Sequence, residues 1–194
     1  MAKPAKKSKA KSVDKWKLKK KYEVIAPDIF NNVMIGPIFA KDEETLLGRT
    51  VETTMSKLVG SNQHHIKVML TVDGTQGFNA KTSVKTVELS RAYISSQTGP
   101  GGNIVENVFR AKTKDEKDVV IKTVMFTRGK ATTEQKKALR ALSEEMVIEE
   151  CAKSDCDKLI QEVVFGKMGS AIFGKARKVL PVGRVEVRKL EIAK

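Results

Sequence analysis

The spacing of apolar residues changes near Gly129, and this change limits the possible fold more than any other feature of the sequence. Before Gly129, every second residue from Ile66 to Val72 is apolar, a period of two that turns one face of a strand inward. After Gly129, the apolar residues between Ala138 and Met146 repeat at helical spacing instead. The sequence therefore predicts an α+β fold in which a β-rich part precedes a helical part.

The β-rich part is divided by Gly, Pro, Asp and Asn into short apolar segments. They predict strands at residues 22–26, 33–39, 46–55, 66–72, 78–87, 103–111 and 119–127. Residues 73–77 and 112–117 have the composition of hairpin turns. Ser90 is placed to cap a short helix that runs to about Gln97 and ends before a glycine-rich loop. Short strands with one helical insert predict a barrel-like body, closed or partly closed.

The helical part begins with a capping-box spacing between Thr132 and Gln135, which predicts a helix to about Lys153. Two further helices are predicted at 155–165 and 170–179, followed by a closing strand at 182–192 that contains a bulge. The predicted organisation has three parts: a basic disordered tail at 1–20, a β-rich body at 21–130, and a helical segment with a C-terminal strand at 131–194.

Positive charge is concentrated at the N-terminus. The first 21 residues supply +9 of the formal net charge of +14, because they contain one acid and ten lysines: Lys3, Lys6, Lys7, Lys9, Lys11, Lys15, Lys17, Lys19, Lys20 and Lys21. The small and polar residues between these lysines bury too little surface to offset the entropy of ordering, so we expect this tail to be disordered in the free protein. Such a run favours a polyanionic partner, and a solubilising tail is the alternative.

Several classes of protein are disfavoured by the sequence. No run approaches the roughly 18 apolar residues needed to cross a bilayer, and no signal peptide is evident, so we expect a cytoplasmic protein without a membrane partner. Cys151 and Cys156 are the only cysteines, too few for a zinc site of about four ligands, and we expect reduced thiols packed in the interior. No cofactor, metal or small-molecule substrate is predicted.

Catalytic arrangements are also missing from the sequence. His64 and His65 are the only histidines, and as neighbours on a strand they would point to opposite faces. No nucleophile elbow, Walker loop, zinc-protease helix or dinucleotide fingerprint is present. Gly166 and Gly169 form a GxxG pattern like that of the loop with which KH domains bind single-stranded nucleic acid. We favour the interpretation that a glycine here ends one helix and turns the chain into the next.

Candidate binding residues are mainly cationic, since aromatic residues make up only 5% of the chain, and phosphate contact with folded RNA therefore fits better than base stacking. Trp16 is the exception, and it is expected to stack on a base, to insert into a crevice or to attach the tail to the body. Arg49, Arg91, Arg128 and Lys130 lie beside predicted turns or strand ends and are candidates for one RNA-facing patch, with ordinary solvated charge as the alternative.

Three further candidates, Lys136, Lys137 and Arg140, lie near the start of the long predicted helix. The helix dipole is positive there, so each cation costs about 0.3 to 1 kcal/mol at low salt. All three occupy one arc away from the apolar stripe. Phosphate of an RNA would compensate this cost, and nearby acids of the same protein are the alternative.

Five segments of the chain resemble the motifs of one known family. They are Lys20 to Pro27, Phe30-Asn31 with Ile35-Gly36, Leu47 to Glu52, Phe126 to Ala131, and Leu180 to Lys189. In the same order they are similar to landmarks of the archaeal and eukaryotic small-subunit ribosomal protein family S-three-Ae, also called eS-one. The resemblance covers nearly the whole chain. Two segments depart from the family: residues 54–58 read Thr-Met-Ser-Lys-Leu where it commonly has Ser-Leu-x-Asp-Leu, and it does not consistently keep the GxxG.

The resemblance implies a structural protein on the platform of the small ribosomal subunit, near the end of the small-subunit ribosomal RNA and the messenger exit path. Its implied partners are that RNA and neighbouring small-subunit ribosomal proteins, with messenger RNA as a further candidate. The chain ends at Lys194 without the C-terminal extension of eukaryotic members, which indicates an archaeal-type member. Two alternatives remain: a free regulatory module that binds RNA or DNA, and an RNA-processing enzyme that uses carboxylates.

Overall fold

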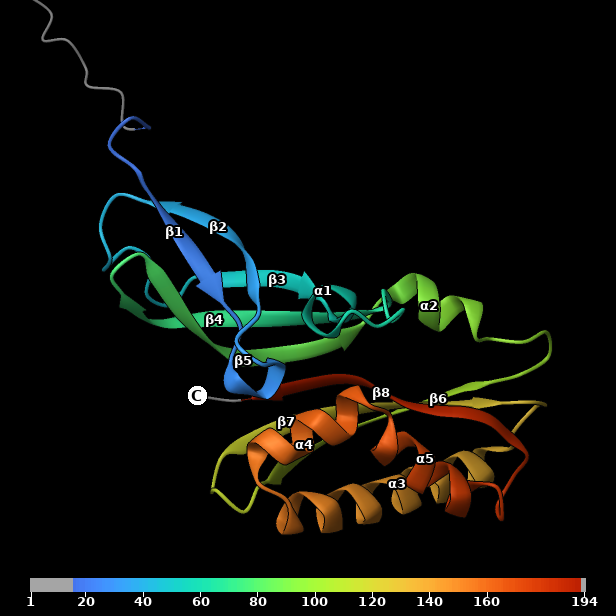
Figure 1. The fold of residues 1–194 in the computed structure, drawn as a ribbon. Helices are drawn as coiled ribbons and strands as arrows, with labels where there is room; N and C mark the ends of the chain where they lie inside the picture. The colour runs from blue at the N-terminus through green and yellow to red at the C-terminus, as the bar shows by residue number, and fades with distance from the viewer. Residues whose placement is uncertain (1–15, 193–194) are drawn as a thin grey trace, which may run out of the picture.

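A computed structural model describes residues 16–192 of the protein (Figure 1). The strands are β1 (Lys20–Ile25), β2 (Met34–Ala40), β3 (Thr50–Thr54), β4 (Ile66–Gln76), β5 (Asn79–Leu89), β6 (Ile104–Lys112), β7 (Asp118–Thr127) and β8 (Val182–Ile192). The α-helices are α1 (Met55–Val59), α2 (Arg91–Ser96), α3 (Thr133–Lys153), α4 (Cys156–Val164) and α5 (Lys167–Ala176), and Asp28–Phe30 form a 3-10 turn. The predicted α+β class is confirmed, with a β-rich body, then helices, then a closing strand.

The strands form one open sheet that branches at β5. Strand β4 pairs antiparallel with β5 along its length, while the other edge of β5 is shared by two partners. Its first residues pair in parallel with β1, and its last residues pair antiparallel with β8. The order is β2-β1-β5-β8-β7-β6, with β3 attached to β4, and within residues 16–192 this path does not close. The barrel-like body is therefore an open, branched sheet.

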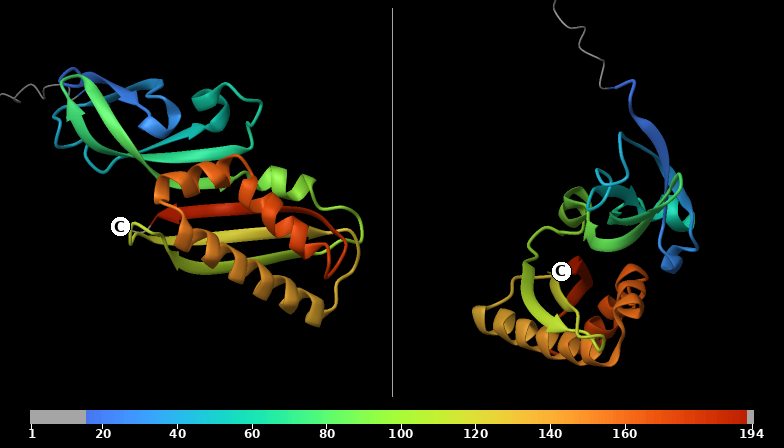
Figure 2. Two further views of the ribbon diagram at one scale, coloured as in Figure 1. Left: turned by 60° about the horizontal axis from the view of Figure 1, so that its bottom comes forward. Right: turned by 90° about the vertical axis from the view of Figure 1, so that its left-hand side faces the viewer.

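Helices α3 to α5 and the first five strands lie on opposite sides of the β6-β7-β8 part of the sheet (Figures 1 and 2). Helices α3, α4 and α5 cover one face, and α2 lies on the side of β1 to β5. Fully buried side chains fill the space between the three helices and the sheet, among them Leu139, Leu159, Ile172, Ile121 and Leu190. Burial of such side chains is worth roughly 1.5 to 3 kcal/mol each, so this layer is the main source of stability.

A second, smaller cluster lies within the β1 to β5 part, where Tyr22, Leu46 and Val72 pack with two alanines. The inward-facing residues predicted in β4 are confirmed, because Ile66 and Val72 and the two alternate residues between them are all buried, but the alternation ends at Thr71, which is buried as well. These inward-facing residues fix the face that the strand turns to the core.

Several local predictions are confirmed. The Ser90 hydroxyl accepts a hydrogen bond from the Tyr93 backbone N–H at the start of α2, and the capping box of Thr132 and Gln135 begins α3. Residues 113–117 form the turn between β6 and β7. The bulge expected in the closing strand is at Arg188, since Val187 and Lys189 pair with consecutive residues of β7.

Other local predictions are wrong. The strand expected at 46–55 is limited to Thr50–Thr54. Gly48 takes a left-handed φ of 77°, which makes a turn before the strand. The residues from Met55 form α1, which buries Met55 and Leu58. Ala138 is exposed rather than part of the buried stripe of α3. The two histidines lie in the turn before β4, not on a strand, and the His65 ring stacks on Tyr93 at 4.0 Å between centroids.

Cys151 and Cys156 are free and buried, as expected for packing-type thiols. Burial raises the pKa of Cys151 to about 11 and also raises the pKa of Cys156. Both thiols are therefore protonated near neutral pH, which makes them poor nucleophiles.

Candidate nucleic-acid interface

The N-terminal lysines fall into two groups. Lys3, Lys6, Lys7, Lys9, Lys11 and Lys15 lie outside the described residues. Lys17, Lys19, Lys20 and Lys21 are exposed, the last two on β1. Since β1 pairs with β2 and β5, these cations are attached to the folded body, at the end from which the chain enters the sheet (Figure 1).

Trp16 contacts the body at β2. Its ring lies 5.8 Å from the Phe39 ring between centroids, and the Lys19 ammonium lies 4.1 Å from the Trp16 centroid. The contact with Phe39 is the attachment of tail to body that was one of the sequence-based expectations. Trp16 nevertheless remains 61% exposed, so stacking on a base stays a prediction.

The four cations expected to form one patch do not all lie together. Arg128 lines a hollow with Gln97 of the α2 end and Arg184 of β8, and Lys130 follows two residues later. Arg91 begins α2, whose other end reaches this hollow. Arg49 lies apart, because its guanidinium donates to the Phe39 carbonyl at 3.2 Å on the β2 side.

The separation of Arg49 follows from strand geometry. The Arg49 carbonyl accepts a hydrogen bond from the Val72 N–H, in the second half of β4. Helix α2, by contrast, begins beside the start of β4, where the Ser90 N–H donates to the His65 carbonyl. The six residue steps along β4 from Ile66 to Val72 correspond to roughly 20 Å. The single patch is therefore reduced to the α2, β7 and β8 side.

The first turns of α3 carry Lys136, half-buried, and Lys137 and Arg140, both exposed. The Arg140 Nε–H donates to the Glu106 carbonyl of β6 at 3.1 Å, and the Asn107 amide of β6 donates to the Arg140 carbonyl at 3.0 Å. Within residues 16–192 none of the three cations forms an ion pair with a carboxylate. Direct neutralisation by an acid of the same protein therefore finds no support there.

Arg184 is a candidate that sequence reasoning missed. Its Nε forms an ion pair with Glu186 Oε1, and the Tyr93 hydroxyl donates to the same oxygen at 2.7 Å. Burial and this hydrogen bond raise the pKa of Tyr93 to about 12, so the hydroxyl stays a donor at neutral pH. The network holds the guanidinium in place while 53% of the Arg184 side chain remains exposed.

A charge pattern in the sequence could have pointed to this region. Between Gly166 and Val185 the chain has no acidic residue and five basic ones: Lys167, Lys175, Arg177, Lys178 and Arg184. This segment comprises α5 and the start of β8, which pack against each other. It is a second concentration of positive charge, far along the chain from the N-terminal lysines.

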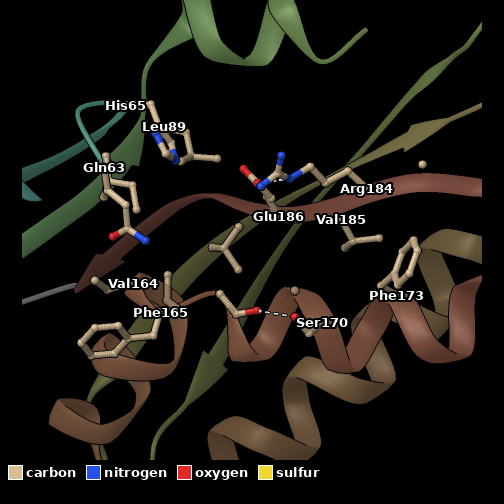
Figure 3. A pocket seen from close by; sticks show the side chains of 16 residues that line it. Gln63, His65, Leu89, Val164, Phe165, Ser170, Phe173, Arg184, Val185 and Glu186 are labelled. Carbon is tan, nitrogen blue, oxygen red and sulfur yellow. Dashed lines mark hydrogen bonds and ion pairs between the residues drawn. The ribbon is translucent and has the colours of Figure 1, made fainter. Parts of the chain in front are cut away.

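A groove with a volume of about 360 Å³ lies between β8 and the α4–α5 turn (Figure 3). Phe165, 55% exposed, lies at one end, with Gln63 and His65 across from it. Arg184 and Phe173 lie toward the other end. The groove therefore combines an exposed aromatic ring with a fixed cation.

The GxxG segment borders this groove but is not a KH-type loop, because Lys167 to Gly169 are already helical. Gly166 takes a left-handed φ of 72° and turns α4 into α5, as the favoured interpretation expected. A Cβ on Gly169 would lie 2.5 Å from the Val185 carbonyl oxygen. Gly169 is therefore required by the close approach of α5 to β8.

No group of three or more His, Cys, Asp or Glu residues that could hold a metal ion occurs in residues 16–192. In the same part of the chain, no helix is both long enough and apolar enough to cross a membrane.

Comparison with known proteins extends the resemblance of the motifs. The model of the Ribosomal S3Ae family matches residues 7–194. A similar protein is "Small ribosomal subunit protein eS1" of Staphylothermus marinus, 39% identical over 180 residues, with 92% of this chain and 85% of that protein covered. The protein of the same name from Archaeoglobus fulgidus is 36% identical over 186 residues, with 94% and 88% covered. That from Ignicoccus hospitalis is 36% identical over 182 residues, with 92% and 86% covered.

These relatives come from archaea, in agreement with the archaeal-type features of the sequence. The family match includes the basic N-terminal segment from residue 7, the branched sheet and the helices. Because it extends over almost the whole chain, the chain belongs to the ribosomal S3Ae family.

Proposed function

We propose that the chain is a structural constituent of the small ribosomal subunit that binds ribosomal RNA through phosphate contacts. The match of the ribosomal S3Ae family over residues 7–194 carries this proposal. A member of a ribosomal protein family is a structural protein rather than an enzyme, in agreement with the lack of a catalytic arrangement in the sequence. The net charge of +14 supports a polyanionic partner.

The proposal assigns different roles to the three parts of the chain. Residues 1–20 supply cations for phosphates, residues 21–130 form the β-rich body, and residues 131–194 add the helical layer and the closing strand. Neighbouring small-subunit proteins are further partners. A position on the platform near the messenger exit path, with messenger RNA as an additional partner, is the finer part of the proposal and rests on the family resemblance.

Sedimentation of ribosomes tests this function. We expect the tagged full-length chain to be recovered in small subunits from its source cells at one copy per subunit. It should remain bound after a wash at moderate salt, because many phosphate contacts act together. Recovery only in the free-protein fractions would instead indicate a regulatory module.

The start of α3 gives a sharper test of phosphate contact. The double variant Lys136→Glu with Lys137→Glu should be as stable as the unmodified chain or slightly more so, because acidic side chains suit the N-terminal end of a helix dipole. Its affinity for small-subunit ribosomal RNA should fall, and the slope of log affinity against log salt should decrease by roughly 1.4 to 1.8 for two lost contacts. Melting temperature and RNA affinity are measured on one preparation.

A matched control is Lys114→Glu with Lys117→Glu, which makes the same charge change in the exposed β6–β7 turn among Asp115, Glu116 and Asp118. This control should bind RNA nearly as well as the unmodified chain. A clear fall in melting temperature for the α3 variant would mean that its lysines serve the fold. Equal RNA binding by the α3 variant and the control would mean that this face of α3 does not contact RNA.

A further inference from the structure

We infer that the groove between β8 and the α4–α5 turn binds one unpaired nucleotide of RNA, with its base against Phe165 and its phosphate at Arg184. This inference rests on the proposed function, since it takes the ligand to be RNA, and it adds a single-stranded site to a protein whose composition favours contact with folded RNA. Phosphate contact alone would not require an exposed aromatic ring.

The volume of the groove is sufficient for a small ligand. Its volume of about 360 Å³ falls within the range of roughly 300 to 1,000 Å³ that is usual for ligand sites. Phe165 comes directly after α4 and holds its ring at the rim, as the C-cap residue of that helix. An aromatic face exposed in basic surroundings is the element with which proteins stack single-stranded bases.

The charge around the groove favours an anion. Of the five basic residues between Gly166 and Val185, Arg184 lines the groove, and Lys167 directly follows the lining residue Gly166. The groove does contain one carboxylate, that of Glu186, but Tyr93 and Arg184 already share its Oε1. Outside the groove lining, the segment from Gly166 to Val185 adds four further cations and no acid, which favours the approach of a polynucleotide backbone.

Contacts within the protein already hold the Arg184 side chain in one position without a ligand. Its Nε is engaged by Glu186, and its Nη1 lies 3.4 Å from Gln97 Oε1. These contacts limit the rotation of the side chain, so less conformational entropy is lost when it binds a ligand. The planar guanidinium can then present its remaining N–H groups to phosphate oxygens.

The start of α5 adds positive potential at the Phe165 end of the groove, since Gly166 directly follows Phe165. Gly166 leaves the first turn of α5 without a side-chain cap, and both Gly166 and Ser170 line the groove. Uncapped N–H groups and the positive end of the helix dipole favour a nearby anion. The close approach of Gly169 to Val185 holds this end of α5 against β8.

The inference is tested by comparing two RNA probes with the full-length chain. One probe is a fluorescent single-stranded oligoadenylate of eight nucleotides, and the other is a blunt duplex with the same number of phosphates. Phe165→Ala should weaken binding of the single strand by roughly 5- to 150-fold, the loss of one stacked base, and should leave binding of the duplex unchanged. Phe165→Trp should retain the affinity, because it keeps an aromatic face.

The matched control is Phe78→Ala, which removes another exposed phenyl ring, 66% exposed, at the turn between β4 and β5. It should bind both probes like the unmodified chain. Equal affinity of Phe165→Ala and the unmodified chain for the single strand would overturn the inference. Equal losses of affinity on both probes would also overturn it, and so would the absence of measurable binding of the single strand by the unmodified chain. The proposed function fails on a different result, namely the absence of the unmodified chain from small subunits.

Discussion

Deletion of residues 2–15 is expected to lower the affinity of the chain for small-subunit ribosomal RNA most strongly at low salt. The deletion removes Lys3, Lys6, Lys7, Lys9, Lys11 and Lys15 but leaves Trp16 and β1 in place. If all six lysines contact phosphates, the slope of log affinity against log salt should decrease by roughly 4 to 5. Between 50 and 200 mM salt, the shortened chain should then lose about 250- to 1,000-fold less affinity than the full chain.

The measurement is a salt series of binding constants for one ribosomal RNA fragment. A second variant, with the same six lysines replaced by glutamine, keeps the length of the chain and removes only the charges. Both variants should give the same reduced slope. An unchanged slope in both would show that the segment acts as a solubilising tail.

Gly169→Ala should lower the free energy of unfolding by about 1 to 3 kcal/mol, the usual cost of overpacking. The added Cβ would meet the Val185 carbonyl oxygen at 2.5 Å, and this neighbour is backbone of β8 rather than a movable side chain. For a chain of this size, each kcal/mol corresponds to a fall of about 2 to 4 °C in melting temperature. Urea unfolding and thermal melting both measure the effect.

Gly174→Ala on the same helix is the matched control, with an expected effect of opposite sign. A Cβ at Gly174 meets no atom within 4 Å, so the change removes only the poor helix propensity of glycine. It should raise the free energy of unfolding by up to about 1 kcal/mol. If Gly169→Ala were as stable as Gly174→Ala, the contact between α5 and β8 would be looser than described.

Sequence reasoning succeeded where a feature depends on residues close together in the chain. The buried face of β4, the capping box at Thr132 and the bulge near Arg188 follow from local spacing, and all are confirmed. Helix α1 was missed because it is a single short turn of five residues, and the turn at Gly48 interrupts what reads as one apolar run. Local patterns cannot separate such a turn from a strand end.

The candidate site depended on long-range contacts and was largely beyond sequence reasoning. Arg184 is held by an ion pair with Glu186, which in turn accepts a hydrogen bond from the Tyr93 hydroxyl. Tyr93 and Glu186 are 93 positions apart in the chain. Arg49 separates from the other cations because it lies beside Val72 of β4 while α2 begins beside His65, and this pairing cannot be read from composition. The sequence did predict cationic surfaces, but the choice between patches required the fold.

The central position of β8 has a consequence for the synthesis of this protein. Strand β8 is the last strand in chain order, yet it joins β5 on one side to β7 on the other. While the ribosome is still adding residues before Ile192, the edges of β5 and β7 that β8 will occupy have no partner, and α5 lacks the strand on which it packs. The two halves of the sheet can thus be joined only after β8 has been synthesised. During that interval the nascent chain exposes unpaired strand edges, which favour aggregation, and early contact of its lysines with RNA would keep such chains apart.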